Sequence, residues 1–349
     1  MLQVDVVLDG DTIKHAQPIL GSMHRGAEKL FESRDYRQIM MLANRHEWLS
    51  AFSGELGVAQ LLERALGIEV PETARWIRTL LLEINRVTSH LAFISGFPFQ
   101  DDSLVQAIRQ WRELWVELTR QYTGSRMHPM LSRIGGLHSA PSVQWLDTLE
   151  RETTHALALH SSLSDTLGKE VEPFAGIGIL SRATAQEYSL SGPVARASGY
   201  LLDLRSSAHE LCYQNINFAQ VSVYGLESQD AHSDVKARLL QLWLEVLQSL
   251  QLIESLFQNP PVNFQDINVL LPKVVRVPEG QYTHQIETPL GIASWFLVSR
   301  GDKMPYRLKL RPASLHTVLA LPAVLDGQSR NDFDAIVASM PFVAGDIDR

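Results

Sequence analysis

Cationic side chains are unusually dense among apolar residues between Met23 and Pro71. A helix that only fills a core has little use for cations beside residues such as Met40 and Trp48. Arginines that lie inside a protein need a partner there, such as a carboxylate, an anion or a cofactor. We therefore expect this stretch to hold such a partner. Its cations include Arg25, Lys29, Arg34, Arg37, Arg45 and His46.

A second cationic segment covers residues 124–136 and contains Arg126 and His128. It is too apolar and too cationic for an ordinary solvent-exposed loop. The two side chains either face a buried partner or belong to a structured surface turn. Arg86 and His90 are four residues apart and would share one face of a helix. The residues alone favour a surface pair there, or a histidine that caps the core.

Composition and motifs exclude several functions. The chain has 349 residues and a net charge of −8, with 45% hydrophobic residues, which is enough for a large core. The absence of a basic run makes nucleic-acid binding an unexpected role. One cysteine, Cys212, permits neither an internal disulfide nor a self-contained iron–sulfur or nickel site. The sequence has no signal-peptide pattern, no stretch of about 20 apolar residues, and no CxxC, HExxH, GxSxG or Walker motif.

Apolar residues at helical spacing predict that long helices position these side chains. Asp35 can cap a helix through Ala43, Pro71-Glu72 can start the next long helix after a break, and Gly96-Phe97-Pro98 can end it. Asp101-Asp102-Ser103 can cap a further helix. The predicted helices are 35–43, 47–66, 72–96, 102–121, 142–167, 234–257, 314–321 and 332–340, followed by an extended tail.

Alternating patterns predict a hairpin over residues 2–18 and a small antiparallel sheet from strands 273–277, 281–288, 292–299 and 306–310. Residues 176–180 are predicted to be a short buried strand or turn. The expected fold class is α+β and mainly helical, a helical bundle with an N-terminal β-hairpin and a small late antiparallel sheet. We divide it into a hairpin (1–20), a helical core (21–262), a sheet region (263–312), and C-terminal helices with a tail that pack on the core (313–349).

Three blocks of sequence resemble a known family: HRGAEKL from His24, ANRHEW from Ala43, and ELGVAQLLERALGIEVP from Glu55. They resemble the D subunit of bacterial respiratory complex I, the NADH–quinone oxidoreductase, which is related to the large subunit of nickel–iron hydrogenases. Later blocks at 191–199, 203–205, 305–309 and 346–349 are also similar, so the resemblance covers nearly the whole chain.

The resemblance implies a hydrogenase-large-subunit-like fold without metal. Where hydrogenases carry their first CxxC, this chain has Phe52-Ser53-Gly54-Glu55, and cysteine is also missing from the residues after Leu308. In the family, the vacated space becomes the head of a quinone cavity. A neighbouring subunit places the terminal iron–sulfur cluster at its edge, and electrons pass from that cluster to quinone.

Site residues follow from the same resemblance. Arg45 matches the arginine close to the terminal cluster, and His128, beside Arg126, matches the histidine whose protonation follows reduction of the cluster. Trp48 stands where most members have a tyrosine that binds the quinone carbonyl. An indole N–H can donate a hydrogen bond but cannot give up a proton as a phenol does. Trp48 therefore either holds the quinone by stacking and one donor, with His46 assisting, or simply fills core.

Two further features depart from the family pattern. A His-Pro-Ser-Thr-His-Gly loop that carries the other quinone ligand is expected just before Leu2, where this sequence begins. We interpret this as a start assigned too late, because the rest of the pattern survives, and the alternative is the loss of half of the headgroup site. The loop after His90 is short, and the family acid expected there is either Asp101 or Asp102.

The resemblance therefore implies a subunit of a proton-pumping NADH–quinone oxidoreductase, peripheral on the cytoplasmic side of the cell membrane, with quinone as substrate. Expected partners are the C subunit, the iron–sulfur B and I subunits and the membrane H subunit, without contact to nucleic acid. One alternative is a subunit of a nickel-free hydrogenase-related membrane oxidoreductase, and another is a non-catalytic assembly or scaffold paralogue. Residues expected in structural or interface roles are His24, Arg25, Arg86, His90, Arg196, Arg307 and Arg349.

Overall fold

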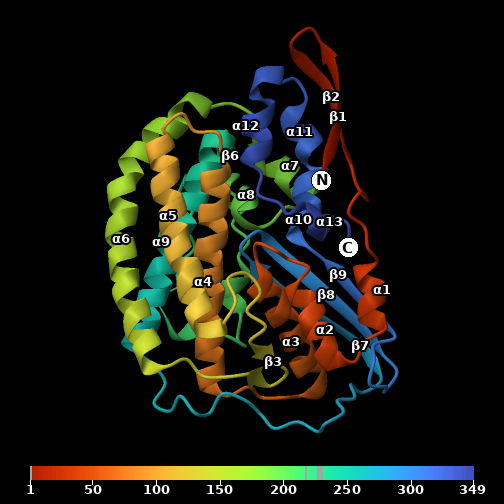
Figure 1. Cartoon of the computed structure of the whole chain (residues 1–349). Coiled ribbons are helices and arrows are strands. Elements are labelled where there is room, and N and C mark those ends of the chain that lie inside the picture. The colour runs from red at the N-terminus through yellow and green to blue at the C-terminus, as the bar shows by residue number, and fades with distance from the viewer. Residues whose placement is uncertain (1, 217, 226–230) are drawn as a thin grey trace.

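The computed structural model describes residues 2–216, 218–225 and 231–349. Long helices form a bundle on one side of the molecule, on the left in Figure 1. Neighbouring pairs within the bundle are α4 with α9, α4 with α5, α5 with α6, and α6 with α9, which closes a ring of four. The helices are α4 (Glu72–Gly96), α5 (Asp102–Thr123), α6 (Val143–Val171) and α9 (Val235–Gln258).

The second half of the molecule is built on a three-stranded antiparallel sheet in the order β7-β8-β9. Helix α3 packs on β7 and β8, and Gly57 makes this close approach possible. A Cβ at Gly57 would lie 2.6 Å from Nε1 of Trp295, so a larger residue would push helix and sheet apart. The elements are α1 (Ala27–Glu32), α2 (Tyr36–Asn44), α3 (Ala51–Leu66), β7 (Gly280–Thr288), β8 (Gly291–Ser299) and β9 (Arg307–Arg311).

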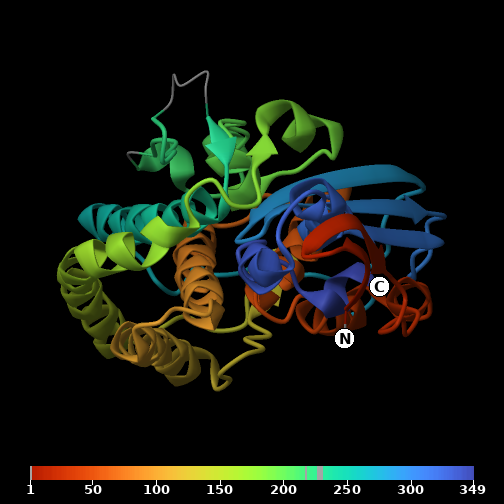
Figure 2. The ribbon, with the colours of Figure 1, turned by 90° about the horizontal axis from the view of Figure 1, so that it is seen from above.

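The N-terminal hairpin projects from the body beside the C-terminal helices (Figure 1). Strand β2 is fixed there by two backbone hydrogen bonds, from the Ile13 nitrogen to the Gln328 oxygen and from the Gly327 nitrogen to the Ile13 oxygen. Figure 2 shows the C-terminal helices grouped together near one end of the sheet. These elements are β1 (Gln3–Asp9), β2 (Thr12–Ile19), α10 (Ala313–Leu319), α11 (Leu321–Leu325), α12 (Phe333–Ala338) and α13 (Ala344–Ile347).

Short elements connect these parts. A two-residue strand pair, β3 with β4, follows α5, and a second pair, β5 with β6, brings residue 180 beside residue 233. The predicted fold class, mainly helical with an N-terminal hairpin and a late antiparallel sheet, is confirmed. The connecting elements are β3 (Ser132–Arg133), β4 (Gly136–Leu137), β5 (Leu180–Ser181), α7 (Arg182–Glu187), α8 (Gly192–Ala197) and β6 (His232–Ser233).

Several predicted boundaries are wrong. Helix α3 begins at Ala51 rather than at residue 47, because Glu47 accepts hydrogen bonds from the backbone and hydroxyl of Ser50 in a tight turn. Helix α6 continues past Gly168, because Val171 still packs into the core. The predicted helices 314–321 and 332–340 are present as α10 and α12, each of which ends two residues earlier than predicted. A further helix, α11, follows α10, and the predicted extended tail contains α13.

The predicted strand 273–277 is not a strand. Its alternation reflects burial of Val275 and Val277, which are 7% and 0% exposed, and not backbone pairing. Prolines at 272 and 278 flank the segment, and proline lacks the N–H that a sheet ladder requires. In the part of the chain that the structure describes, no helix is long and apolar enough to cross a membrane.

Candidate functional site

The turn between α2 and α3 faces the connector that joins α5 to α6, residues 124–142. Asp35 starts α2 with a capping box, in which its side chain accepts from the backbone of Gln38 and the Gln38 side chain accepts from the Asp35 backbone. The helix ends at Asn44, and residues 45–50 form the turn. This arrangement brings the turn, which carries Arg45, His46 and Trp48, alongside the connector.

Glu55 fixes the connector to this turn. Its side chain accepts hydrogen bonds from the backbone nitrogens of Leu131 at 3.0 Å and Ser132 at 2.9 Å, and from Nδ2 of Asn44 at 2.6 Å. Burial raises the pKa of Glu55 to about 7, against the lowering effect of these donors. Glu55 stands in the position where the hydrogenase resemblance would place a metal thiolate, and here it anchors protein backbone instead.

A cavity of about 140 Å³ lies between the turn and the connector. Trp48, Leu49 and Phe52 form one wall. The remaining walls come from α4 and α5 and from the connector residues Arg126 and Met127. Trp48 is 36% exposed, so it is a surface-facing wall and not a core side chain. Lining from α4 and α5 consists of Leu81, Ile84, Asn85, Thr88, Arg112, Val116 and Thr119, and Pro129 completes the connector wall.

Neither Arg45 nor His128 lines this cavity, but His128 lies between the lining residues Met127 and Pro129, and the charge of Arg45 acts on its ring. An Nη atom of Arg45 is 3.8 Å from the sulfur of Met130. Partial burial and the charge of Arg45 both lower the pKa of His128, whose ring interacts with the backbone of Asn44. The imidazole is therefore neutral near pH 7, although a new negative charge nearby would favour its protonation. Arg126 forms an exposed ion pair with Glu113 at 2.8 Å.

The ring of Trp48 rests on the C-terminal segment. A Cβ added to Gly345 would lie 2.7 Å from Cζ2 of Trp48, so α13 and the indole pack without any intervening side chain. Glu47 and Asp346, which precede and follow this contact, are both buried carboxyls. Burial raises the pKa of Glu47 to about 7, and burial and the charge of Glu47 together raise that of Asp346 well above its usual range.

His46 points away from the cavity side of the turn. It is 2% exposed, and burial, with Arg25 and Arg349 nearby, lowers its pKa to about 4. The cavity is lined by Trp48 and not by His46. Of the predicted site residues, Trp48 and Arg126 line the cavity, and Arg45 and His128 lie close to residues that line it. His46 instead lies near Arg25 and the C-terminal Arg349.

The cations of the first stretch are not buried as predicted. Arg25, Lys29, Arg34, Arg37 and Arg45 are all exposed, and only His46 of that set is buried. Arg37 and Arg45 lie eight residues apart on one side of α2, with Met41 between them, also exposed. The fully buried arginines lie elsewhere in the described chain: Arg78, Arg86, Arg196, Arg205 and Arg238.

Four of the predicted structural residues gather at the C-terminus. The ring of His24 is 2.8 Å from the Asp348 carbonyl oxygen, and Arg349 pairs with Glu28 at 3.4 Å. Arg307 bridges Glu28 and Glu32 at 2.6 and 2.7 Å, which ties β9 to α1. Arg25 donates to the Arg45 carbonyl oxygen at 3.4 Å and so links this cluster to the α2–α3 turn.

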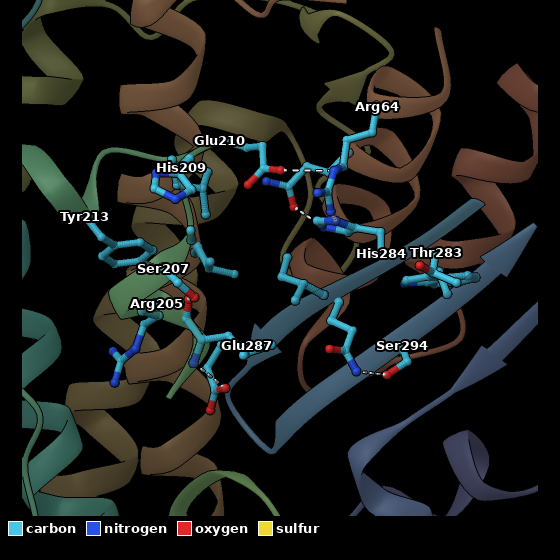
Figure 3. A pocket seen from close by; sticks show the side chains of 18 of the residues that line it. Arg64, Arg205, Ser207, His209, Glu210, Tyr213, Thr283, His284, Glu287 and Ser294 are labelled. Carbon is cyan, nitrogen blue, oxygen red and sulfur yellow. Dashed lines mark hydrogen bonds and ion pairs between the residues drawn. The ribbon is translucent and has the colours of Figure 1, made fainter. Parts of the chain in front are cut away.

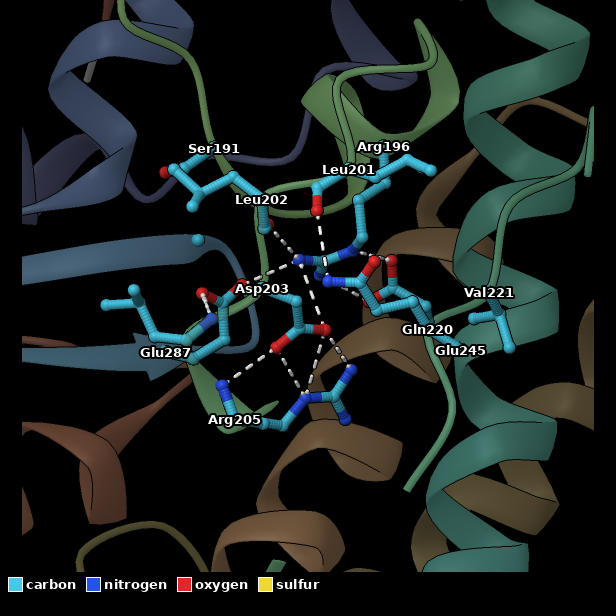
Figure 4. A network of polar contacts seen from close by, with 12 residues as sticks. Ser191, Arg196, Leu201, Leu202, Asp203, Arg205, Gln220, Val221, Glu245 and Glu287 are labelled. Carbon is cyan, nitrogen blue, oxygen red and sulfur yellow. Dashed lines mark hydrogen bonds and ion pairs between the residues drawn. The ribbon is translucent and has the colours of Figure 1, made fainter. Parts of the chain in front are cut away.

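The remaining three, Arg86, His90 and Arg196, belong to a buried polar network between the bundle and the end of β7. Figure 4 shows the part of this network around Arg196. Arg196 binds Glu245 through two nitrogens at 2.7 and 2.9 Å and Glu287 at 2.8 Å. Arg86 donates to the Thr288 and Glu287 carbonyl oxygens at 2.9 and 3.1 Å. The interpretation of Arg86 and His90 as a surface pair is therefore wrong, because both are fully buried.

Sequence reasoning missed the acidic side of this network. Glu83 accepts from Arg86 at 3.3 Å and Arg205 at 3.2 Å, and Asp203 accepts from Arg205 at 2.8 Å. A usable signal was present, because Glu83 and Arg86 lie three residues apart on the apolar stripe of α4. A charged pair on an otherwise apolar helix face predicts a buried ion pair.

A second and larger cavity, of about 650 Å³, lies between α3, the sheet and residues 204–213 (Figure 3). Arg64 crosses its rim, where it approaches Glu210 at 3.4 Å and the ring of His284 at 3.3 Å. Arg205 and Glu287 of the buried network reach its floor. No sequence motif predicted this cavity, since its walls come from three separate parts of the chain.

Asp101 and Asp102 lie at the start of α5. Asp101 caps the helix by accepting from the backbone nitrogens of Ser103 and Leu104 at 2.8 and 3.2 Å. The α5 residues that line the smaller cavity, Arg112 to Thr119, lie about three turns further along. Within residues 2–216, 218–225 and 231–349, no group of three or more His, Cys, Asp or Glu side chains is placed to hold a metal ion.

Comparisons with known proteins agree on one family. A model of the respiratory-chain NADH dehydrogenase 49 kDa subunit matches residues 102–274 and 258–349. The D 2 subunit of the Streptomyces griseus NADH-quinone oxidoreductase is 43% identical, over 100% of this chain and 89% of the relative. The D subunit of the Carboxydothermus hydrogenoformans enzyme is 32% identical, over 100% of this chain and 94% of the relative.

A solved structure gives the same result for the fold. A chain of the membrane-bound sulfane sulfur reductase, an archaeal respiratory membrane complex, superposes with a TM-score of 0.91 at 29% identity, covering 100% of this chain and 94% of that one. The matches to the two relatives and the superposition cover the whole chain, and the family model covers residues 102–349. The chain therefore belongs to the family of the 49 kDa subunit of respiratory-chain NADH dehydrogenase, the D subunit of NADH-quinone oxidoreductase.

Proposed function

We propose that this chain forms a wall of the quinone-binding cavity of a proton-translocating NADH–quinone oxidoreductase, next to an iron–sulfur cluster carried by a partner subunit. The observation that carries the proposal is the cavity beside Trp48, with Arg45 and His128 adjacent to it. The cavity walls combine aromatic and aliphatic side chains with polar ones such as Asn85 and Arg126, which suits a flat ring that carries carbonyl oxygens. The cationic edge suits an electron donor that becomes more negative when reduced.

Trp48 is the residue that would hold the electron acceptor. Its indole offers a flat face for stacking and one N–H donor, but no proton to transfer. The contact with Gly345 sets the angle of the ring, because α13 lies directly against it. The chain itself supplies orientation and exclusion of water, and the electrons come from the partner subunit's cluster.

His128 would bind a proton when the cluster is reduced. The imidazole is neutral in the structure because burial and Arg45 lower its pKa. Reduction adds a negative charge, which opposes both effects and raises that pKa. The exposed cations on α2 and the connector fit a surface that the cluster-bearing subunit covers, since cations near a cluster stabilise its reduced form.

The proposed partners are the C subunit, the iron–sulfur B and I subunits and the membrane H subunit of the same complex. Attachment to these subunits would hold the chain as a peripheral protein on the cytoplasmic side of the membrane. Oxidation of NADH takes place in other subunits under this proposal, and this chain acts only at the quinone end.

The test is a redox titration of the terminal cluster in the assembled complex with His128→Gln. Coupled uptake of one proton per electron gives the wild-type potential a slope of about 59 mV per pH unit. Glutamine keeps a hydrogen-bond donor toward the Asn44 backbone but does not titrate, so the slope should vanish. His138→Gln, an exposed histidine on the same connector, is the matched control and should keep it. An unchanged slope in His128→Gln would refute the role of His128.

A second candidate function is the reduction of an acceptor other than quinone, with electrons that come from the same cluster of the partner subunit. Two observations favour it: Trp48 stands where most of the family has a tyrosine, and the superposition includes a sulfane sulfur reductase. Steady-state assays of the purified complex with quinone and with a polysulfide would separate the two. Turnover with polysulfide but not with quinone would establish the second candidate.

A further inference from the structure

Charges do not balance in the buried network of Figure 4 and its continuation around Glu83. Among the residues that the structure describes, four carboxyls meet three guanidinium groups there, and every one is at most 3% exposed. An unbalanced charge away from water is costly, so a buried site of this kind takes up a proton or a cation. The carboxyls are Glu83, Asp203, Glu245 and Glu287, and the guanidiniums are Arg86, Arg196 and Arg205.

His90 does not supply the missing positive charge. Its Nε2 is 2.8 Å from the Pro289 carbonyl oxygen, to which it donates. Its Nδ1 is buried and has no hydrogen-bond partner, so a second proton on the ring would point at no acceptor. Burial lowers the pKa of His90 to about 4, although Glu245 lies 4.0 Å away. The ring is therefore neutral near pH 7, and the imbalance stays on the carboxyls.

Glu287 is the most weakly paired of the four. Glu245 receives two nitrogens of Arg196, and Asp203 receives the side chain of Arg205 through both oxygens. Glu287 shares Arg196 with those two carboxyls and otherwise accepts from the Leu204 backbone at 3.3 Å. Burial raises the pKa of Glu287, Arg196 opposes this, and the charge of Asp203 adds to it.

Glu287 is surrounded by charged groups from each element packed against the end of β7. Arg196 on α8 pairs with Glu287 at 2.8 Å, and Asp203, which precedes residues 204–207, pairs with the same Arg196 at 3.6 Å and acts on Glu287 through its charge. Helix α4 presents Arg86, whose side chain binds the backbone beside Glu287, and α9 presents Glu245 on the other side of Arg196. The remaining titratable neighbours in the network are Glu83, His90, Arg205 and Tyr213.

The network is not sealed from solvent. Glu287, Arg205 and Tyr213 line the 650 Å³ cavity (Figure 3). Arg64 and Glu210 line it as well, and their side chains are 56% and 35% exposed. A cavity of this volume admits water, which can carry a proton to the carboxyl. We propose that Glu287 is a proton-binding site that holds one proton at neutral pH and exchanges it with water in this cavity. Release of that proton to water leaves a carboxylate and takes the network from zero to −1.

Proton binding at Glu287 does not depend on the identity of the electron acceptor. The test is the infrared difference spectrum between the wild-type complex and the complex with Glu287→Gln at pH 7. Loss of the carbonyl stretch of a protonated carboxyl, a band that shifts in deuterated water, is the expected result. Loss of carboxylate stretches instead would overturn the proposal. Glu172→Gln, which removes an exposed carboxylate paired with Lys236 at 2.6 Å, is the control and should lose carboxylate stretches.

A second background tests the charge balance itself. Glu245→Gln leaves three carboxyls for three guanidiniums, so Glu287 should then be ionised. Replacing Glu287 in that background should remove carboxylate stretches and not the carboxyl band. If the carboxyl band is lost in both backgrounds, charge balance does not determine whether Glu287 is protonated, and the reasoning is overturned. A carboxylate result in wild type, together with thermal stability that rises with sodium concentration, would identify a bound alkali cation instead of a proton.

Discussion

Replacing Gly345 by alanine tests whether Trp48 contacts the electron acceptor. The new Cβ would lie 2.7 Å from Cζ2 of Trp48, whereas ordinary contact begins at 3.4 Å, so the ring must withdraw by about 0.7 Å. Over-packing of this kind costs about 1–3 kcal/mol. If that cost falls on the bound state, 1.4 kcal/mol corresponds to about a tenfold loss of kcat/KM. Displacements near 1 Å have comparable effects in well-ordered sites.

The assay is quinone reduction by the assembled complex, with kcat and KM determined separately. Gly168→Ala is the matched control, because a Cβ there meets nothing within 4 Å and the position lies inside α6. Alanine in a helix interior should stabilise the chain by about 0.5–1 kcal/mol and leave kinetics unchanged. Wild-type kinetics in Gly345→Ala, with normal assembly, would refute the placement of the acceptor against Trp48.

Three further changes test the supports of the site. Glu55→Gln should flatten the dependence of the unfolding free energy on pH, because the raised pKa of Glu55 gives stability below pH 4.5 that is lost, by up to about 3 kcal/mol, as pH rises through about 7. Denaturant unfolding of the purified chain at pH 5 and pH 8 measures this loss. Parallel pH profiles for the wild type and the variant would contradict the prediction. Arg78→Leu should cost about 3–5 kcal/mol in the same assay, because it strands buried Glu63, now bound at 2.6 and 3.0 Å; a loss below 1 kcal/mol would count against it. Arg126→Ala breaks an ion pair whose two side chains are each 53% exposed, so the loss of stability should stay under about 1 kcal/mol. The KM for the electron acceptor should change. An unchanged KM would show that Arg126 is not part of the site.

Local signals predicted much of the helical framework. Asp35 followed by Gln38 is a capping box in sequence and in structure, and Asp101 caps α5 as expected. These signals work because a cap depends on residues within one turn of helix. The hairpin could be predicted in the same way, since Asp9-Gly10 marks its turn. Each of these features is decided by neighbours in the chain.

Features that depend on residues far apart in the sequence could not be predicted in this way. The spacing of cations along α2 does not reveal whether Arg37 and Arg45 face a core or a surface, and the structure leaves both exposed. The pairing of Arg196 with Glu245 and Glu287 joins residues 49 and 91 positions apart. The alternation at 273–277 correctly indicated which valines are buried, but burial does not require a strand partner.

The most direct test of the quinone proposal is photoaffinity labelling of the assembled complex with a quinone that carries a photoreactive group on its ring, followed by peptide mapping. We expect labelling of the walls of the smaller cavity, on the peptides that contain Trp48 and Met127, and protection by excess unlabelled quinone. Protected labelling on the sheet face around Phe296, in the larger cavity, would contradict the proposal.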